Sequence, residues 1–451
     1  MNVLLVSTYE LGHQPLGLAA PLAHLHAAGI AARAVDAAVE PLPDAALAAA
    51  DVIAFSVPMH TALRLAVPLA ARTRRLNPRA HICFYGLYAA LNAAYLLRTC
   101  ADSVIGGEVE EPLVRLVQRL AHGEGPEAPA LTALGRPTYL PPRREGLPPL
   151  ARYAHLVHGE RLALVGCVEA SRGCAHHCRH CPIPPVYGGR LRVVPVDVVL
   201  ADARRLAALG ATHLTFADPD FFNGVRHAMA VLRALHAALP HVTFDVTVKI
   251  EHLIEHQALL PELRDLGCLF IVSAVESLSD AVLSALDKGH IAVDVVTALA
   301  LTRRAGIRLR PSLLPFTPWA TLDDYCTLLE FVAANDLVAD IDPVQYAIRL
   351  LVPPGSSLLG TPAMQPYLGP LEEEAFAYTW RHPDPRMDAL ARAVAARVED
   401  AARRHEAPAR TFATVCDLAR EAGGRPRRRV PRVPVSPLPG PSPRLTEPWF
   451  C

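Results

Sequence analysis

One short run, Ala170-Ser171-Arg172-Gly173-Cys174-Ala175-His176-His177-Cys178-Arg179-His180-Cys181-Pro182, carries the most specific signal in the chain. Its three cysteines, Cys174, Cys178 and Cys181, follow the spacing CxxxCxxC. A cubane iron–sulfur cluster is normally held by four thiolates, one for each iron. Three thiolates in one loop therefore predict a cluster with one iron left open to a small molecule, and an open metal position is where chemistry takes place.

Zinc and a disulfide are the alternatives for these three cysteines. Structural zinc takes four ligands, usually from two separated pairs, and no second CxxC pair follows in the sequence. Because His176, His177 and His180 lie between the cysteines, a zinc site completed by histidine stays open. A disulfide is disfavoured, since the three thiols are crowded together while the other cysteines are scattered singly.

Residues 162–168 form an apolar run that predicts a strand leading into the cysteine loop. A strand followed by this spacing resembles the radical S-adenosylmethionine (SAM) superfamily, in which the loop follows the first strand of a partial (β/α) barrel. The resemblance implies an enzyme whose Cys174, Cys178 and Cys181 bind a [4Fe-4S] cluster. SAM then chelates the open iron and is cleaved to a 5′-deoxyadenosyl radical. The family commonly has an aromatic residue near the adenine, directly before the last cysteine, and here His180 stands there.

Two later strand ends resemble the SAM contacts of that superfamily. Asp218 lies in Thr215-Phe216-Ala217-Asp218-Pro219-Asp220, where the family holds the SAM amino group, and a carboxylate accepts charge-assisted hydrogen bonds from an ammonium. A turn aspartate before proline is the alternative. Glu276 and Ser277, followed by Asp287-Lys288-Gly289, resemble the family's ES…VL…KG stretch, in which the Glu-Ser pair approaches SAM. A surface cap is the alternative there.

The composition is that of a globular protein of two or three domains, with 451 residues and 51% hydrophobic side chains. Lys+Arg and Asp+Glu balance at 44 each, so nucleic acid and anionic membranes are not expected as partners. No stretch reaches the roughly 18 apolar residues of a membrane span. We expect a cytoplasmic protein with reduced thiols. Six further cysteines are expected to be buried and inert: Cys83, Cys100, Cys167, Cys268, Cys326 and Cys416.

Residues 1–121 alternate apolar runs with helical patterns, which is typical of a parallel βαβ layer. Strands are expected at 3–7, 52–56 and 81–85. The segment resembles the cobalamin-binding-like domain that precedes many radical SAM barrels. The resemblance leaves cobalamin open as a second cofactor, because the DxHxxG motif of some such domains is absent. His13 is followed by Gly17 with the wrong spacing for a cobalt ligand.

The rest of the chain divides by composition. Residues 122–160 are rich in Pro and Gly, and beyond them helix, glycine and strand recur three times, at Gly210, Gly267 and Gly306. We therefore predict an α/β fold with a Rossmann-like doubly wound domain and a partial (β/α)6 barrel. The predicted bounds are 1–121 for the Rossmann-like domain, 122–160 for a linker, 161–360 for the barrel, 361–424 for a helical cover and 425–451 for a Pro/Arg-rich flexible tail.

The sequence closes with Leu445-Thr446-Glu447-Pro448-Trp449-Phe450-Cys451. Exposed Trp, Phe and a free thiol are disfavoured on a solvated tail unless they have a task. The arrangement resembles the CUAEP/CCAEP-tail radical SAM (seleno)proteins, and this implies a redox role for Cys451 as the first residue of such a tail. The alternative is a natural terminus with an inert cysteine.

The resemblance implies SAM-derived radical chemistry on an unidentified small-molecule or peptide substrate. Cobalamin-dependent methyl transfer is the first outcome considered, and an oxidation or rearrangement without cobalamin is the second. A flavodoxin or ferredoxin is the expected reductant. From another class, the chain could be an iron–sulfur electron carrier or maturation protein, which the SAM-contact residues of the barrel argue against.

Overall fold

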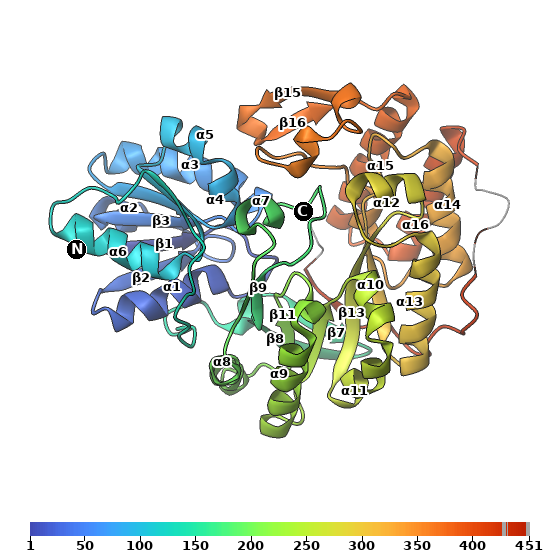
Figure 1. The fold of residues 1–451 in the computed structure, drawn as a ribbon, viewed down its shortest axis with the longest axis horizontal. Helices are drawn as coiled ribbons and strands as arrows, with labels where there is room; N and C mark the ends of the chain where they lie inside the picture. Colours follow the sequence, from blue (N-terminus) through green and yellow to red (C-terminus); the bar gives the residue numbers. More distant parts are fainter. Residues whose placement is uncertain (426–429, 431, 448–451) are drawn as a thin grey trace.

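The computed structural model describes residues 1–425, 430 and 432–447. Two α/β bodies lie side by side in Figure 1, the amino-terminal one in blue and cyan and the second in green to orange. Among the described residues, no helix is long and apolar enough to cross a membrane.

The first body is a parallel sheet of six strands in the order β2-β1-β3-β4-β5-β6. β1 and β3 are buried along their whole length, as strands covered by helices on both faces must be. Leu4 and Val6 enter one core, and Val3 and Leu5 enter the core on the opposite face. The predicted doubly wound domain is thereby confirmed. Its elements are β1 (Val3–Ser7), α1 (Leu16–Ala27), β2 (Ala32–Asp36), α2 (Asp44–Ala49), β3 (Val52–Ser56), α3 (His60–Leu76), β4 (His81–Tyr85), α4 (Leu87–Leu91), α5 (Ala93–Thr99), β5 (Ser103–Gly107), α6 (Glu110–Ala121) and β6 (Ala130–Ala133).

The second body is a seven-stranded sheet in the order β14-β13-β12-β11-β8-β7-β17. The five neighbouring strands β8, β11, β12, β13 and β14 run parallel to one another, which confirms the partial barrel. An isolated parallel bridge between Phe316 and Arg349 follows them. The strands are β7 (His155–His158), β8 (Arg161–Val168), β11 (His213–Phe216), β12 (Thr243–Thr247), β13 (Cys268–Glu276), β14 (Arg308–Leu313) and β17 (Arg444–Leu445). The helices are α8 (Val196–Ala208), α9 (Val225–Ala238), α10 (Ile250–Glu255), α11 (Leu260–Asp265), α12 (Asp280–Leu286), α13 (Ala292–Ala305) and α14 (Leu322–Ala334).

The connector and the expected helical cover contain more strand than their sequences indicate. The connector supplies β6 to the first sheet and β7 to the second. The cover holds α15 (Pro385–Arg403) and α16 (Pro408–Glu421), but a hairpin of β15 (Leu368–Glu372) and β16 (Ala377–Trp380) precedes them. Phe376 of that hairpin packs into the core of the first body, beside Tyr95. The hairpin, orange at the top of Figure 1, therefore links the two bodies.

The last described segment, residues 432–447, is extended as expected, but it is docked along the barrel. Because proline has no N–H, this proline-rich segment does not pair as a continuous strand, and its carbonyl groups accept hydrogen bonds from arginines of the barrel instead. Arg303 bonds to the Val435 oxygen at 2.9 Å, Arg308 to the Leu438 oxygen at 3.0 Å and Arg310 to the Pro443 oxygen at 3.1 Å. β17 then pairs antiparallel with β7. Cys451 lies outside the described residues, so its predicted redox role stays a prediction.

The six cysteines away from the loop are free thiols. Cys83, Cys167, Cys268 and Cys326 are buried, whereas Cys100 and Cys416 are half-buried. Burial raises the pKa of the Cys83 thiol to about 12. The expected burial is confirmed for four of these residues and is wrong for Cys100 and Cys416, although burial raises the thiol pKa of these two as well.

Candidate functional site

The cysteine loop begins where β8 ends. A short strand, β9 (Ser171–Gly173), pairs with β10 (Leu191–Val193) and leads into Cys174. Gly173 has a positive φ of 72°, and a side chain there would collide with the carbonyl oxygen of Arg190. Glycine is therefore required where the chain turns into the loop.

The three cysteines of the loop are free thiols, of which Cys174 and Cys178 are buried and Cys181 is half-buried. Burial raises the pKa of Cys181 to about 12, and metal coordination is what deprotonates such a thiol.

Glu276 holds the far end of the loop. It ends β13 with a φ of 62°, a left-handed conformation that non-glycine residues rarely adopt outside functional sites. Its Oε1 accepts hydrogen bonds from Lys288 Nζ at 3.1 Å and His180 Nε2 at 3.2 Å. Burial alone would raise the pKa of Glu276, but Lys288 and His180 outweigh it and hold the pKa well below its ordinary value. Glu276 is thus a buried carboxylate and not a surface cap.

Asp218 holds the near end of the loop. Its carboxylate accepts from the Ala170 amide at 2.9 Å and from the Ser171 hydroxyl at 2.5 Å, which joins the ends of β8 and β11. Burial raises the pKa of Asp218 to about 6. Ser277 is buried as well, and its hydroxyl accepts from the Ser279 amide at 3.1 Å in the turn before α12. The predicted residues Asp218 and Glu276 therefore bracket the cysteine loop, and Glu276 makes its contact through His180 of the loop itself.

Asn223 is a site residue that the sequence analysis missed. Its Nδ2 donates to Cys174 Sγ at 3.3 Å, and its Oδ1 accepts from the Ala175 amide at 3.3 Å. Hydrogen bonds to cluster sulfurs are one of the factors that set the reduction potential. No sequence pattern around Asn223 could have predicted this contact, because Asn223 and Cys174 are 49 positions apart in the chain.

A cavity of about 280 Å³ lies between the loop after β1 and the carboxyl ends of the barrel strands. Its polar lining includes Glu10, His13, Asp218, Asp245, Arg310 and Glu447. Burial lowers the pKa of His13 to about 4 and raises that of Glu10 to about 7. The cavity lies at the end of the strands where a barrel places its reaction site.

Arg172, between β8 and the cysteines, connects the loop to the first body. It makes ion pairs with Glu110 at 2.6 Å, Glu169 at 2.7 Å and Glu108 at 3.2 Å. Glu108 follows β5 of the first sheet, Glu110 begins α6, and both side chains are buried. The cysteine loop is therefore fixed directly to the amino-terminal body.

Residues 168–332 match the family model of the radical SAM superfamily. A proposed methylthiotransferase of Methanocaldococcus jannaschii is 22% identical over 329 residues, which cover 67% of this chain and 68% of that protein. The radical SAM methyltransferase TsrM of Kitasatospora setae, solved with cobalamin and a [4Fe-4S] cluster, superposes with a TM-score of 0.62. It is 17% identical and covers 74% of this chain and 73% of that one.

The cobalamin-dependent SAM radical enzyme OxsB, solved with aqua-cobalamin, superposes with a TM-score of 0.67 and 15% identity. The match covers 87% of this chain and 66% of that one. At these identities the two structures establish the fold of both bodies. The chain carries a radical SAM domain and is an enzyme, and a domain of this class uses a [4Fe-4S] cluster and SAM.

Proposed function

We propose that this radical SAM enzyme binds its [4Fe-4S] cluster through Cys174, Cys178 and Cys181. The observation that carries the proposal is the loop with its three free thiols, because the segment leading into it is bonded to Asp218, a residue that lines the cavity at the strand ends. The bound cluster supplies an electron that cleaves SAM to a 5′-deoxyadenosyl radical. The side chains around the loop would position SAM for that step.

Each bracketing residue has a task that its surroundings support. His180 offers a flat ring next to Glu276, where an adenine could stack on it. Ser277, in the same strand-end turn, adds a hydroxyl near Glu276. Asp218 lines the cavity and offers carboxylate oxygens to the SAM ammonium. Lys288 neutralises Glu276, so that the anionic cluster does not face an uncompensated carboxylate.

The cavity lining favours a small polar substrate. Arg310 lines the cavity and pairs with Asp342 at 2.9 Å, and Asp245 accepts hydrogen bonds from His213 at 2.9 Å and Thr215 at 2.7 Å. An arginine beside ordered carboxylates suits a molecule that carries both an acidic and a basic group. An exogenous reductant such as flavodoxin or ferredoxin would supply the electron.

Cobalamin-dependent methyl transfer is the first candidate outcome, because TsrM and OxsB, which share this fold, were solved with bound cobalamin. Bound cobalamin would supply a carrier for the methyl group at the carboxyl ends of the first sheet. The 280 Å³ cavity is at the lower limit for a ligand pocket and is smaller than a corrin requires. Glu447 packs beside Gly12 at that place, so cobalamin binding would require residues 445–447 to move. An oxidation or rearrangement without cobalamin fits the closed cavity directly and is the second candidate.

The test is anaerobic reconstitution with iron and sulfide, followed by reduction with dithionite in the presence of SAM. We expect about four irons per chain and formation of 5′-deoxyadenosine. Cys178→Ala should lose both, because it removes one of three anchors, whereas Cys416→Ala should keep both. Retention of the cluster spectrum and of SAM cleavage in Cys178→Ala would contradict the assignment.

A further inference from the structure

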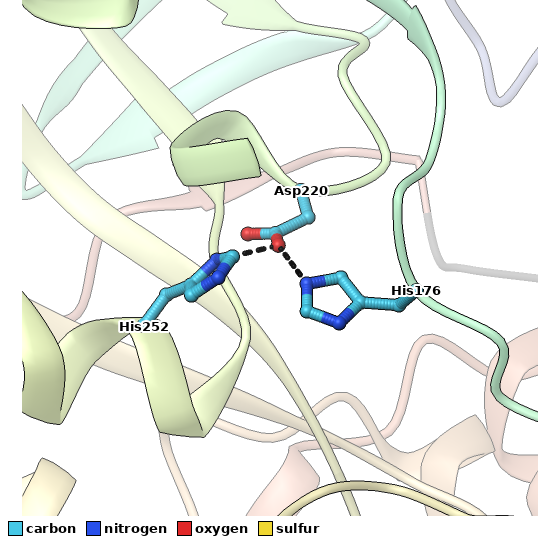
Figure 2. Close-up of side chains that lie close together, drawn as sticks. All are labelled: His176, Asp220 and His252. Atoms are coloured by element: carbon cyan, nitrogen blue, oxygen red, sulfur yellow. Dashed lines mark ion pairs between the residues drawn. The ribbon is translucent and has the colours of Figure 1, made fainter. Parts of the chain in front are cut away.

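A second group of metal-ligating side chains lies beside the cysteine loop and uses none of its thiols (Figure 2). His176 comes from the loop itself, Asp220 follows β11, and His252 lies on α10. Asp220 Oδ2 is 2.7 Å from His252 Nδ1 and 3.2 Å from His176 Nε2. The Asp220 side chain is only 1% exposed, and the two rings are 13% and 21% exposed.

The contacts within this group are short, but they are not aligned as hydrogen bonds. Asp220 Oδ2, His176 Nε2 and His252 Nδ1 are all buried polar atoms without a hydrogen-bond partner. Leaving three such atoms unsatisfied is costly, and native structures rarely do so. The three ligand atoms all lie within 4.8 Å of one another, which is the spacing of ligands around one ion.

The outer atoms of two of these side chains are fixed by neighbours. His176 Nδ1 lies 3.1 Å from Glu251 Oε1, and a ligating histidine typically donates its other ring N–H to a carboxylate in this way. The Lys249 amide donates to Asp220 Oδ1 at 3.1 Å, which leaves Oδ2 for an ion. Lys249 Nζ in turn holds Glu251 at 2.6 Å. Both side chains are therefore held with one ligand atom facing inward.

We propose that His176 Nε2, Asp220 Oδ2 and His252 Nδ1 form a mononuclear binding site for a divalent transition metal ion. Two imidazoles and one carboxylate suit zinc or ferrous iron. Three protein ligands leave a coordination position for water or a substrate atom. His176 is two residues from both Cys174 and Cys178, so the ion would also fasten the cysteine loop to β11 and α10.

The experiment measures metal content in the full chain, reconstituted anaerobically with its cluster and then incubated with Zn²⁺ and desalted. Elemental analysis should find about one zinc in addition to about four irons. Asp220→Asn and His252→Ala should each weaken zinc binding at least tenfold while the iron content stays unchanged. His256→Ala, which changes the next histidine beyond α10, should bind zinc like the unmodified protein. X-ray absorption at the zinc edge should show only nitrogen and oxygen neighbours.

Three results would overturn the metal site: no zinc above the level of the two variants, equal binding in all proteins, or sulfur among the zinc neighbours. The last would mean that zinc occupies the cysteines. The proposed function is judged separately by iron content and 5′-deoxyadenosine. A protein that cleaves SAM without binding zinc refutes only the metal site, and one that binds zinc at the histidines without a cluster refutes only the proposed function.

Discussion

Glu276 shows how a single side chain can be both buried and charged at this site. Its carboxylate faces Lys288 and His180, and its pKa is held below the ordinary value. A carboxyl group with a lowered folded pKa stabilises the protein above its unfolded pKa, and that contribution is lost as the pH falls. Glu276 should therefore favour folding at neutral pH and progressively less in acid.

We predict that Glu276→Gln destabilises the cluster-free protein by about 3 kcal/mol at neutral pH, because it leaves the Lys288 charge buried without a partner. The difference from the unmodified protein should shrink as the pH falls below about 4.5, where the unfolded carboxyl becomes protonated. Urea denaturation at about pH 7 and about pH 4 measures both values. A difference that is equal at the two pH values would contradict this account.

Asn223 gives a prediction about the reduction potential. Asn223→Ala removes the N–H donor to Cys174 Sγ and should make the cluster harder to reduce. If the reduced cluster loses about 1 kcal/mol of stabilisation, the reduction potential falls by roughly 40 mV for a one-electron couple. A redox titration followed by electron paramagnetic resonance measures the shift, with iron content as the control. An unchanged potential would mean that the contact does not tune the cluster.

At the scale of elements, the strands that the sequence predicted are those buried on both faces. β1, β3 and β4 were predicted to the residue, since Val3, Val52 and Ile82 begin or join unbroken apolar runs. β2 and β6 lie at the two edges of the sheet and alternate or lack large apolar side chains, so their sequences gave no distinct signal. The same holds for β17, which has only two residues.

The candidate site divides in the same way. The proposed role of Cys174, Cys178 and Cys181 rests on their local spacing, which can be read directly from the sequence. The contacts of Asn223 and the group of His176, Asp220 and His252 depend on which loops the barrel brings together. Those residues are separated by dozens of positions, and one sequence carries no information on such pairs beyond the predicted topology.

The composition of residues 432–447 predicts a flexible tail, whereas the structure docks this segment along the barrel. Arg308 donates to the oxygens of Leu438 and Pro439, so we predict that Arg308→Gln loosens residues 432–447. A loss of about 1.4 kcal/mol would speed trypsin cleavage after Arg444 roughly tenfold. Timed digestion with mass spectrometry measures the rate. Arg304→Gln, at an exposed neighbouring position, is the matched control and should digest like the unmodified protein.

At the scale of the whole molecule, Arg172 couples the two bodies. The buried Glu108 and Glu110 and the half-buried Glu169 surround it, and Arg172→Gln would leave them without a cation. We predict a loss of roughly 3–5 kcal/mol of stability. The double variant Arg172→Gln, Glu110→Gln should recover part of that loss, because one uncompensated charge is gone. Urea denaturation of the unmodified protein, both single variants and the double variant tests the coupling, and purely additive effects would contradict it.

Whether His13 would be a cobalt ligand of a bound cobalamin can be tested directly. It lines the cavity, but its spacing does not match the cobalt-ligating motif. We predict that any bound cobalamin lacks an imidazole from the protein, so His13→Ala should leave the spectrum of the reduced cofactor unchanged. Loss of a nitrogen splitting from the electron paramagnetic resonance signal in His13→Ala would show that His13 is a ligand after all.

The pairing of β17 with β7 also sets an order of events during synthesis. The His155 amide donates to the Thr446 hydroxyl, across a separation of 291 residues. A ribosome that adds 5–20 residues per second needs roughly 15–60 s to cover that distance. Throughout that interval the nascent barrel presents the outer edge of β7, which another strand could join. Chaperones that shield unpaired strand edges should therefore matter more for this chain than for one whose sheet closes early.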